Sequence, residues 1–206
     1  MNRPLAPLHG TDVLAALRAA TGARHTRLDS GLPLSADHPT LADYAAHLRM
    51  LRDWLAPLER WLAGFTDGPQ AEPTLPPQDR LALIAADLDE PGMDAAHAGG
   101  RAPTPVPARP RQASAAYRWG AAYVIEGSQL GGAVLYARLC GPLAPHPLRY
   151  LRGEAQGPGP RWRAFLQALR ARVTTSEEIA ECCAGACAAF DAILALAPPQ
   201  GATSAP

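Results

Sequence analysis

The chain contains no lysine, and all nineteen basic side chains among its 206 residues are arginine. Aspartate and glutamate also total nineteen, so the formal net charge at pH 7 is zero. A balanced charge produces no global field that would attract nucleic acid or an anionic membrane surface. We interpret the arginine bias, together with the 22 prolines, as compositional. The sequence therefore predicts no nucleic-acid partner.

Long apolar runs are also missing. No run reaches the roughly 18–20 residues of a membrane-spanning helix, and residues 1–9 lack the apolar core of a signal peptide. Both observations predict a cytoplasmic protein with no membrane association. No Cys-x-x-Cys pair occurs among the four cysteines, which we expect to be small buried hydrophobic residues.

The hydrophobic periodicity is helical throughout, with no alternating segment that demands a strand and no internal repeat. Apolar residues recur at helical spacing from Leu41 to Phe65, interrupted at Pro57, which predicts one kinked helix or a pair. Further helices are expected over residues 81–88, 161–172 and 176–196, the last capped by Ser176. With 48% hydrophobic residues, the chain can bury one sizeable core, so we predict a single all-α domain over residues 1–206.

Segments rich in proline and glycine separate the expected helices. Residues 91–110 hold five prolines and show no periodicity, which predicts a long connecting loop. A second loop is expected over residues 141–160. The ends of the chain, residues 1–10 and 200–206, are predicted to be disordered tails.

Three glycines interrupt a stretch of otherwise helical pattern, Tyr123-Val-Ile-Glu-Gly-Ser-Gln-Leu-Gly-Gly132. Each glycine in a helix interior costs about 1 kcal/mol relative to alanine, against a total stability of about 5–15 kcal/mol. Gly127 and Gly131 are four residues apart and share a face, which Ser128 and Gly132 are expected to widen into a glycine strip. Either another helix packs on this strip or the glycines mark a kink, or a planar ligand lies against the bare backbone.

An amphipathic helix that carries His25 is expected near the N-terminus, capped by Thr11 or Asp12. Its apolar stripe also holds Leu14, Leu17, Thr21 and Leu28. A lone histidine on such an inward face is usually a buried core residue. Nearby arginines favour a second interpretation, in which neutral His25 is the axial ligand of a haem and the cations meet its propionates. These arginines are Arg18, Arg24 and Arg27.

The two motifs together resemble those of the biliverdin-forming haem oxygenases. The first is Thr21-x-x-x-His25-x-x-Leu28-Asp29, and the second is Tyr123-Val-x-Glu126-Gly127-Ser128-x-Leu130-Gly131-Gly132. Their order and separation agree with the family, and the similarity extends from about residue 14 to residue 196. It is greatest to the bacterial branch that serves bacteriophytochromes.

The resemblance implies a helical bundle in which haem is both substrate and cofactor, held between the first helix and the glycine helix. His25 would ligate the iron. The distal side, formed by Gly127, Ser128, Gly131 and Gly132, would direct molecular oxygen to one meso carbon, giving biliverdin, carbon monoxide and ferrous iron. Electrons would come from a ferredoxin or reductase, because no nucleotide-binding Gly-x-Gly-x-x-Gly follows a strand. A bacteriophytochrome is the implied recipient of biliverdin.

The resemblance also implies roles for cations. Arg18 matches a basic position that the family uses for a propionate. Gly22 stands where some members carry a second cation, so that contact falls to Arg24 or to no residue. In the expected helix over residues 161–172, Arg163 is the candidate for a further contact at the haem edge.

Two residues of the glycine motif have open roles. Tyr123 either stacks at the haem edge or packs in the core. Glu126 is expected to pair with an arginine or to reach solvent.

One departure from the family pattern concerns Ser128, which stands where the animal members carry an aspartate. A hydroxyl can hold a water but supplies no carboxylate, so proton delivery must be built differently. Ser128 and Gly22 support an alternative function, a haem carrier of the same fold without efficient ring cleavage. A further alternative is an all-α interaction protein or a relative with another ligand, such as the thiamine-degrading group, which would leave His25 and the glycines unrelated.

Overall fold

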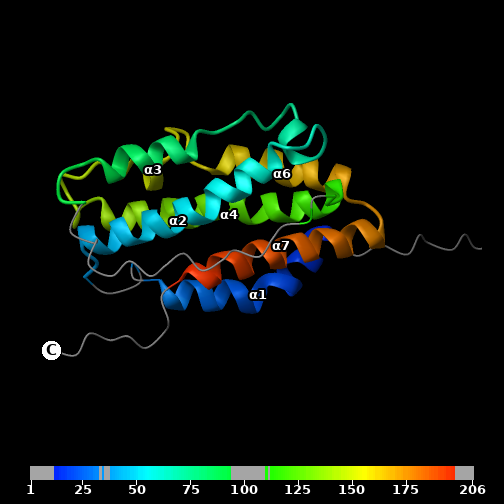
Figure 1. The fold of residues 1–206 in the computed structure, drawn as a ribbon, viewed down its shortest axis with the longest axis horizontal. Helices are drawn as coiled ribbons and strands as arrows, with labels where there is room; N and C mark the ends of the chain where they lie inside the picture. Colours follow the sequence, from blue (N-terminus) through cyan, green and yellow to red (C-terminus); the bar gives the residue numbers. More distant parts are fainter. Residues whose placement is uncertain (1–11, 33, 35–37, 94–109, 111, 198–206) are drawn as a thin grey trace, which may run out of the picture.

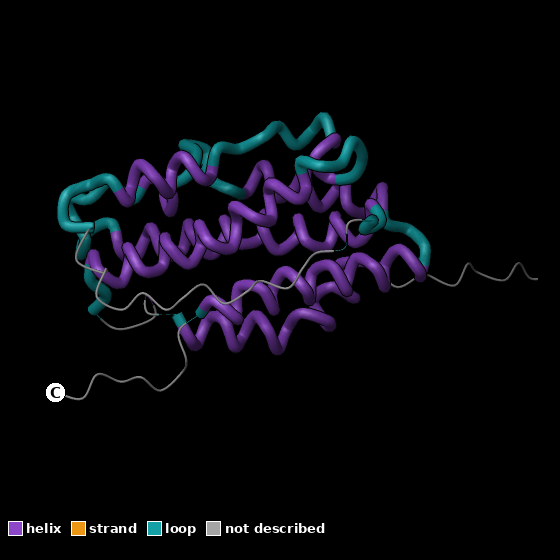
Figure 2. Tube along the Cα trace, in the orientation of Figure 1, coloured by secondary structure: helices purple, strands orange, loops and turns teal. Residues whose placement is uncertain are grey.

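The computed structural model describes residues 12–32, 34, 38–93, 110 and 112–197. Within these ranges the regular structure is helical and no strand occurs (Figure 2), which confirms the predicted all-α class. Most of the predicted loop over residues 91–110 lies outside the described residues. The predicted tails, residues 1–10 and 200–206, lie outside them as well.

The helices follow the predicted order. They are α1 Val13–Gly31, α2 Leu41–Leu62, the short 3₁₀ helix η2 Pro69–Ala71, α3 Arg80–Leu88, α4 Ala115–Leu139, α5 Arg149–Arg152, α6 Gly159–Arg172 and α7 Ser176–Leu196. Pro57 lies inside α2, so the stripe from Leu41 to Phe65 forms one helix rather than a pair. The prediction of an unbroken loop over residues 141–160 is wrong, because it contains α5.

Side-chain caps fix where the long helices begin. The carboxylate of Asp12 accepts a hydrogen bond from the Leu14 amide at the start of α1. At α2, Thr40 forms a capping box with the third helical residue. Thr175 does the same at α7, so the N-cap lies one residue before the predicted Ser176. Such caps satisfy amides that the helix itself leaves unpaired.

Helix α4 occupies the middle of the bundle (Figure 1). It packs against α7 on one side and against α5 and α6 on the other, while α1 lies on α7. The colours of Figure 1 show that α1, α4 and α7 run in the same direction, whereas α2 and α6 run in the opposite direction. This arrangement makes α7 the shared neighbour of the histidine helix and the glycine helix.

The backbones of α4 and α7 touch where they cross. A β-carbon added at Gly120 would overlap the carbonyl group of Cys182, and one added at Gly185 would overlap that of Tyr117. Only glycine allows this approach. Backbone-to-backbone packing through glycine therefore occurs at Gly120 and Gly185. At the predicted strip, Trp162 of α6 lies beside Gly127 and Leu151 of α5 lies beside Gly132, so a helix contact accounts for part of the strip but not for Gly131.

By length and composition, α7 is the one described helix that could cross a membrane. This test alone does not contradict the prediction that the chain has no membrane span. The core helix of a folded domain passes the same test, and α7 packs against α1, α2 and α4. The prediction that the four cysteines are buried holds only in part. Cys182 of α7 is buried, Cys183 and Cys187 of α7 are half-buried, and Cys140 at the end of α4 is exposed.

Candidate functional site

Two glycines of α4 leave bare backbone without any contact that requires it. Gly131 is exposed, and a β-carbon there would have no neighbouring atom within 4 Å. At Gly127 an added β-carbon would meet only the ring of Trp162, at 3.7 Å, which is ordinary van der Waals contact. Alanine would fit at both positions and would favour the helix. The packing of the chain therefore gives no reason for these glycines, whereas an approaching ligand would.

The other two members of the predicted strip lie differently. Gly132 is buried, and a β-carbon there would lie 3.8 Å from the Leu151 side chain. Gly132 thus faces α5 and does not widen the exposed surface, which corrects the sequence interpretation. Ser128 is half-buried and lies between Gly131 and Gly132 around the helix. Its hydroxyl donates a hydrogen bond to the Ile125 carbonyl oxygen at 2.7 Å.

His25 does not point into the core as its stripe predicted. Leu14, Leu17 and Thr21 of the stripe are buried, but the His25 side chain is 64% exposed. Its ring lies 5.9 Å from that of Phe190 on α7, measured between centroids. The imidazole therefore lies over the edge of α7, open to solvent.

The Nδ1 atom of His25 is already engaged. It lies 2.8 Å from Oδ2 of Asp29, one turn later on α1. A neutral imidazole in this contact carries its proton on Nδ1 and keeps the lone pair of Nε2 free. The sequence motif included Asp29 without assigning it a role, although its spacing of four residues from His25 was a usable signal.

Contacts along α7 place His25 and the glycines at one level. Phe190 lies beside His25, and the backbone at Cys182 lies against Gly120 of α4. From Gly120 to Gly127, α4 advances about 10 Å, and from Cys182 to Phe190, α7 advances a similar length in the same direction. His25 and Gly127 therefore flank α7 at about the same height, on helices that make no extended contact with each other.

Arg18 and Tyr123 are brought together across the same space. Arg18 is exposed on α1, and Tyr123 is half-buried on α4 with its ring 5.4 Å from that of Trp162. Burial raises the pKa of the Tyr123 phenol, and the nearby charge of Arg18 opposes that rise. Arg18 of α1 is thus close enough to Tyr123 of α4 for its charge to act on the phenol.

The remaining predicted cations lie apart. Arg24 forms two hydrogen bonds with the Asp191 carboxylate on α7, at 2.8 and 3.1 Å, so it is already paired. Gly22 is exposed with open space around it. Arg163 is exposed on α6, and within the described part of the chain no hydrogen bond or ion pair reaches it. No contact brings Arg163 together with His25.

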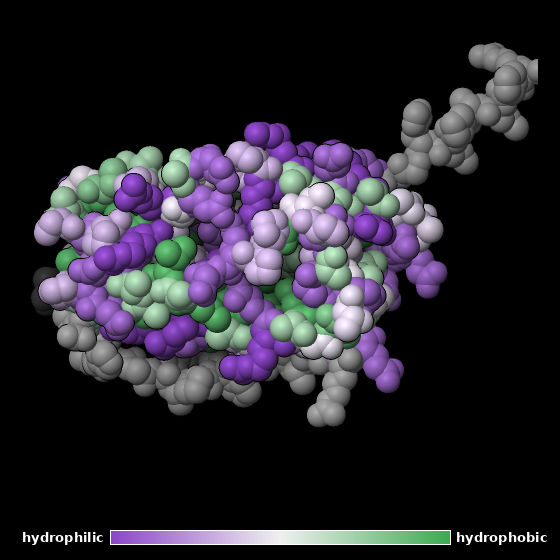
Figure 3. Space-filling model, turned by 90° about the horizontal axis from the view of Figure 1, so that it is seen from above, coloured by the Kyte–Doolittle hydropathy of each residue, from purple (hydrophilic) through white to green (hydrophobic). Residues whose placement is uncertain are grey.

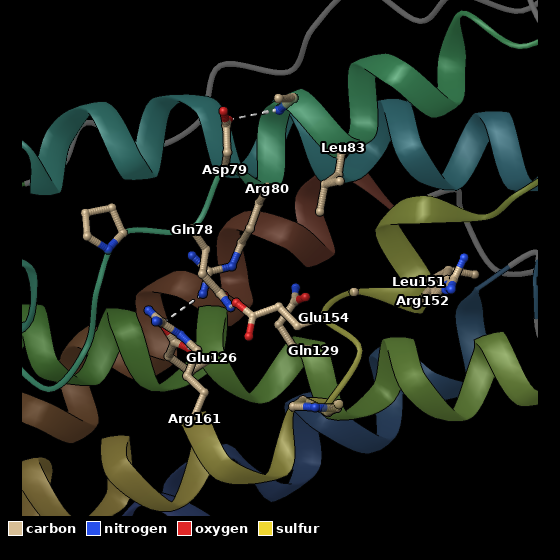
Figure 4. Close-up of a pocket in the computed structure, with 15 residues that line it drawn as sticks. Gln78, Asp79, Arg80, Leu83, Glu126, Gln129, Leu151, Arg152, Glu154 and Arg161 are labelled. Carbon is tan, nitrogen blue, oxygen red and sulfur yellow. Dashed lines mark hydrogen bonds and ion pairs between the residues drawn. The ribbon is translucent and has the colours of Figure 1, made fainter.

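Glu126 pairs with arginine, which is one of the two roles that the sequence analysis left open for it. Its carboxylate accepts hydrogen bonds from Nε and Nη2 of Arg161 at 2.7 and 2.9 Å, and from Nη2 of Arg80 at 2.8 Å. Figure 4 shows Arg80 of α3 and Arg161 of α6 reaching this carboxylate from different sides. The cluster ties α4 to both helices, and sequence reasoning missed the two arginines because they are distant in the chain.

The fold is all-helical in the part of the chain that the structure describes, with α7 lying between the helix that carries His25 and the helix that carries the glycines. One helix offers a histidine with a free nitrogen, and the other offers bare backbone at the same level. The chain belongs to the Heme oxygenase family, whose model matches residues 11–196.

A curated relative agrees with this assignment. The heme oxygenase of Xanthomonas campestris pv. campestris (strain 8004) is 42% identical over 84 residues, which is 39% of this chain and 50% of the relative. The chain therefore spans about half the length of the curated relative it matches. No solved structure matches the chain.

Proposed function

We propose that the protein is a haem oxygenase, which binds haem between α1 and α4 and cleaves its ring to biliverdin, carbon monoxide and ferrous iron. The observation that carries the proposal is the placement of exposed His25, with Nε2 free, at the level of the bare backbone of Gly127 and Gly131. Membership of the family supports the same reaction.

The residues present fit a haem. An axial ligand must reach its iron through an unprotonated nitrogen, and His25 is exposed with Nδ1 held by Asp29. A flat ring needs a surface without side chains, and at Gly131 nothing lies within 4 Å of the β-carbon position. When bound, haem supplies the redox-active iron that activates molecular oxygen.

The chain's own side chains then bind and orient this substrate. His25 would hold the iron, with Asp29 fixing the ring orientation and tautomer. Gly127 and Gly131 would allow close approach on the opposite face, and the Ser128 hydroxyl would supply a polar group there. These contacts would leave one axial position for oxygen.

Arginines at the edge of the proposed haem site would bind the two propionate carboxylates of haem. Arg18 is the first candidate, because it is exposed and acts on Tyr123 across the space between the helices. Arg163 on α6 is the second, because its guanidinium pairs with none of the described residues. In the described geometry Arg24 does not serve as a propionate ligand, because its guanidinium is hydrogen-bonded to the Asp191 carboxylate. Tyr123 would border the haem edge beside Trp162.

The reaction also requires partners. We propose molecular oxygen as co-substrate and a ferredoxin or separate reductase as electron donor. A bacteriophytochrome would receive the biliverdin, and the cytoplasm would be the place of action. The serine in the glycine motif supports the phytochrome-linked branch in particular.

A spectroscopic assay tests the proposal. The protein is titrated with hemin, and ascorbate or a ferredoxin system is then added in air. We expect a Soret band that decays as biliverdin absorption grows. A stable band would instead establish the haem carrier, and absence of a band would overturn both functions.

Matched variants of α1 locate the ligand. His25→Ala should fold normally and lose ring cleavage. The control is Thr26→Ala, which alters the next exposed residue, whose hydroxyl bonds only the Gly22 carbonyl. Thr26→Ala should behave as the unmodified protein, and equal loss in both variants would argue against His25 as the ligand.

A further inference from the structure

Val134 of α4 is 71% exposed, and it is one of two large hydrophobic side chains that are exposed in the described part of the chain. The other is Leu83 of α3. Exposure alone does not indicate a function, because small hydrophobic patches among hydrophilic side chains are ordinary, as the face on the side of α3 shows (Figure 3). Val134 differs from Leu83 in its position, since it lies on the helix that carries the glycine strip.

One face of α4 is covered at its N-terminal end and open further on. Gly120, Gly127 and Val134 follow one another at intervals of seven residues, so they lie within about 40° of one another around the helix axis. A β-carbon at Gly120 would overlap the Cys182 carbonyl of α7, whereas one at Gly127 would meet no atom closer than 3.7 Å. Val134, two turns further on, is largely uncovered. Its side chain therefore stands on the open part of the face that carries Gly127.

The same spacing of seven residues separates Arg18 from His25 on α1, in the opposite direction. Arg18 is exposed, shares the face of His25 and lies about 10 Å nearer the N-terminus. Helices α1 and α4 run in the same direction (Figure 1), and His25 and Gly127 lie at about the same height. Val134 lies about 10 Å beyond that height toward the C-terminus. The proposed haem site thus has a cation at one end and an apolar side chain at the other.

Haem has a matching asymmetry. Its two propionates extend from one edge of the ring, and its vinyl groups lie toward the opposite edge. A carboxylate beside Arg18 gains a charge-assisted hydrogen bond, and a vinyl group against Val134 removes apolar surface from water. The reverse orientation would place two carboxylates against an apolar side chain and a vinyl group beside a guanidinium, with neither gain.

We propose that Val134 sets the direction in which haem lies along α4: it packs against the vinyl-bearing edge, while the propionates lie at the Arg18 end. This inference rests on the proposed function and goes beyond it, because binding between α1 and α4 does not fix which edge of the ring lies at which end. Val134 is therefore a specificity-determining residue, since the direction of the ring decides which meso carbon comes nearest to the open backbone of Gly131.

The test compares two ferric porphyrins by Soret titration without reductant, so that turnover plays no part. One is hemin, and the other is iron deuteroporphyrin, in which hydrogen replaces each vinyl group. Val134→Ala removes two methyl groups and should weaken hemin binding about five- to tenfold, because each buried methyl group contributes about a factor of four. Binding of iron deuteroporphyrin should weaken by about twofold at most, since the vinyl contact is already missing. The control Leu83→Ala should leave both affinities unchanged.

A second pair of ligands tests the other end of the site. The dimethyl ester of hemin keeps the vinyl groups and has no carboxylates. Arg18→Ala should weaken binding of hemin about tenfold and leave binding of the ester unchanged. Arg138→Ala is the matched control, because Arg138 is exposed one turn beyond Val134 and would meet the propionates only in the reverse orientation. It should weaken neither ligand.

Each outcome bears on one claim. Equal effects of Val134→Ala on the two porphyrins, or no effect on either, would overturn this inference and leave the proposed function standing. A carboxylate-dependent loss in Arg138→Ala but not in Arg18→Ala would overturn it by reversing the direction. The haem-free Val134→Ala protein should unfold at an equal or higher temperature, because a helix prefers alanine to valine, so lost binding cannot come from a lost fold. Failure of the unmodified chain to bind hemin would overturn the proposed function and this inference with it.

Discussion

The Nδ1 atom of His25 and the Oδ2 atom of Asp29 lie 2.8 Å apart on the exposed face of α1. Both side chains are more than 60% exposed, so the pair contributes little to the stability of the fold. Its effect is on the imidazole, because a proton held on Nδ1 leaves Nε2 as the only ligating nitrogen. Under the proposed function, the pair would orient the imidazole toward the haem iron rather than hold the helix.

Asp29→Ala should weaken haem binding without unfolding the protein. Loss of a partner that orients a metal-bound histidine typically lowers affinity by about 10–100-fold. Hemin titration of the Soret band measures this change. Asp53→Ala is the control, because Asp53 is an exposed acid on α2 that pairs with Arg52. Equal affinities in the two variants would show that Asp29 has no role at the site.

Gly131→Leu should block haem binding and leave the fold intact. The β-carbon position at Gly131 has no atom within 4 Å, so a leucine there can start without a clash, and its side chain would project into the proposed haem site between α1 and α4. A helix interior also prefers leucine to glycine, which should keep the free energy of unfolding equal or raise it by about 1 kcal/mol. Hemin titration and urea unfolding together test both statements.

The control for Gly131→Leu lies on the same helix. Ala137 is exposed on a different face of α4, so Ala137→Leu adds bulk without approaching the proposed haem site. Haem binding should be normal in this variant. Turnover that survives Gly131→Leu would mean that haem does not lie against the bare backbone.

Local signals in the sequence were sufficient for the long helices. Caps and periodicity predicted the start of α1 and both ends of α7 to within one residue, and they placed the glycine motif on a helix, which is α4. They could not predict α5, because its first amides are satisfied from a distance. The Asp87 carboxylate of α3 accepts from the amides of Arg149 and Tyr150, both at 2.9 Å. A helix of four residues held by such a contact has no signature of its own in the sequence.

The site was predictable where its chemistry is local. The motifs around His25 and Gly131 identified the two helices, and the family match agrees with that resemblance. The face each residue presents was less predictable. Gly132 faces α5, and His25 lies outside the core, because the rotation of a helix depends on every neighbour that it packs against.

Gly120→Ala should destabilise the protein, in contrast to the glycines of the site. Its β-carbon would overlap the Cys182 carbonyl, and rigid backbone on both helices leaves little room to move. Overpacking of a core typically lowers the free energy of unfolding by about 1–3 kcal/mol, and here we expect about 3 kcal/mol or more. Urea unfolding should show Gly120→Ala and Gly131→Ala moving in opposite directions. A neutral Gly120→Ala would mean that α4 and α7 can separate without loss.

Stability at acidic pH should depend on His47 of α2. This side chain is 5% exposed, its Nδ1 has no hydrogen-bond partner among the residues that the structure describes, and burial lowers its pKa to about 4. The unfolded chain protonates His47 near its ordinary pKa of about 6.5. Between these values the unfolded state binds a proton that the folded state does not, so the free energy of unfolding falls as pH falls from about 6.5 to 4. The full effect of this one group is about 3 kcal/mol.

His47→Leu removes that contribution and leaves the carboxylates of the chain unchanged. Urea unfolding at pH 7 and pH 4.5 should show a smaller loss of stability on acidification in His47→Leu than in the unmodified protein. His38→Leu is the matched control, since His38 is an exposed histidine. It should follow the unmodified protein at both pH values. If His47→Leu also followed the unmodified protein, protonation of the buried imidazole would not be what weakens the fold in acid, and His47 would have to find a proton acceptor or water within the core.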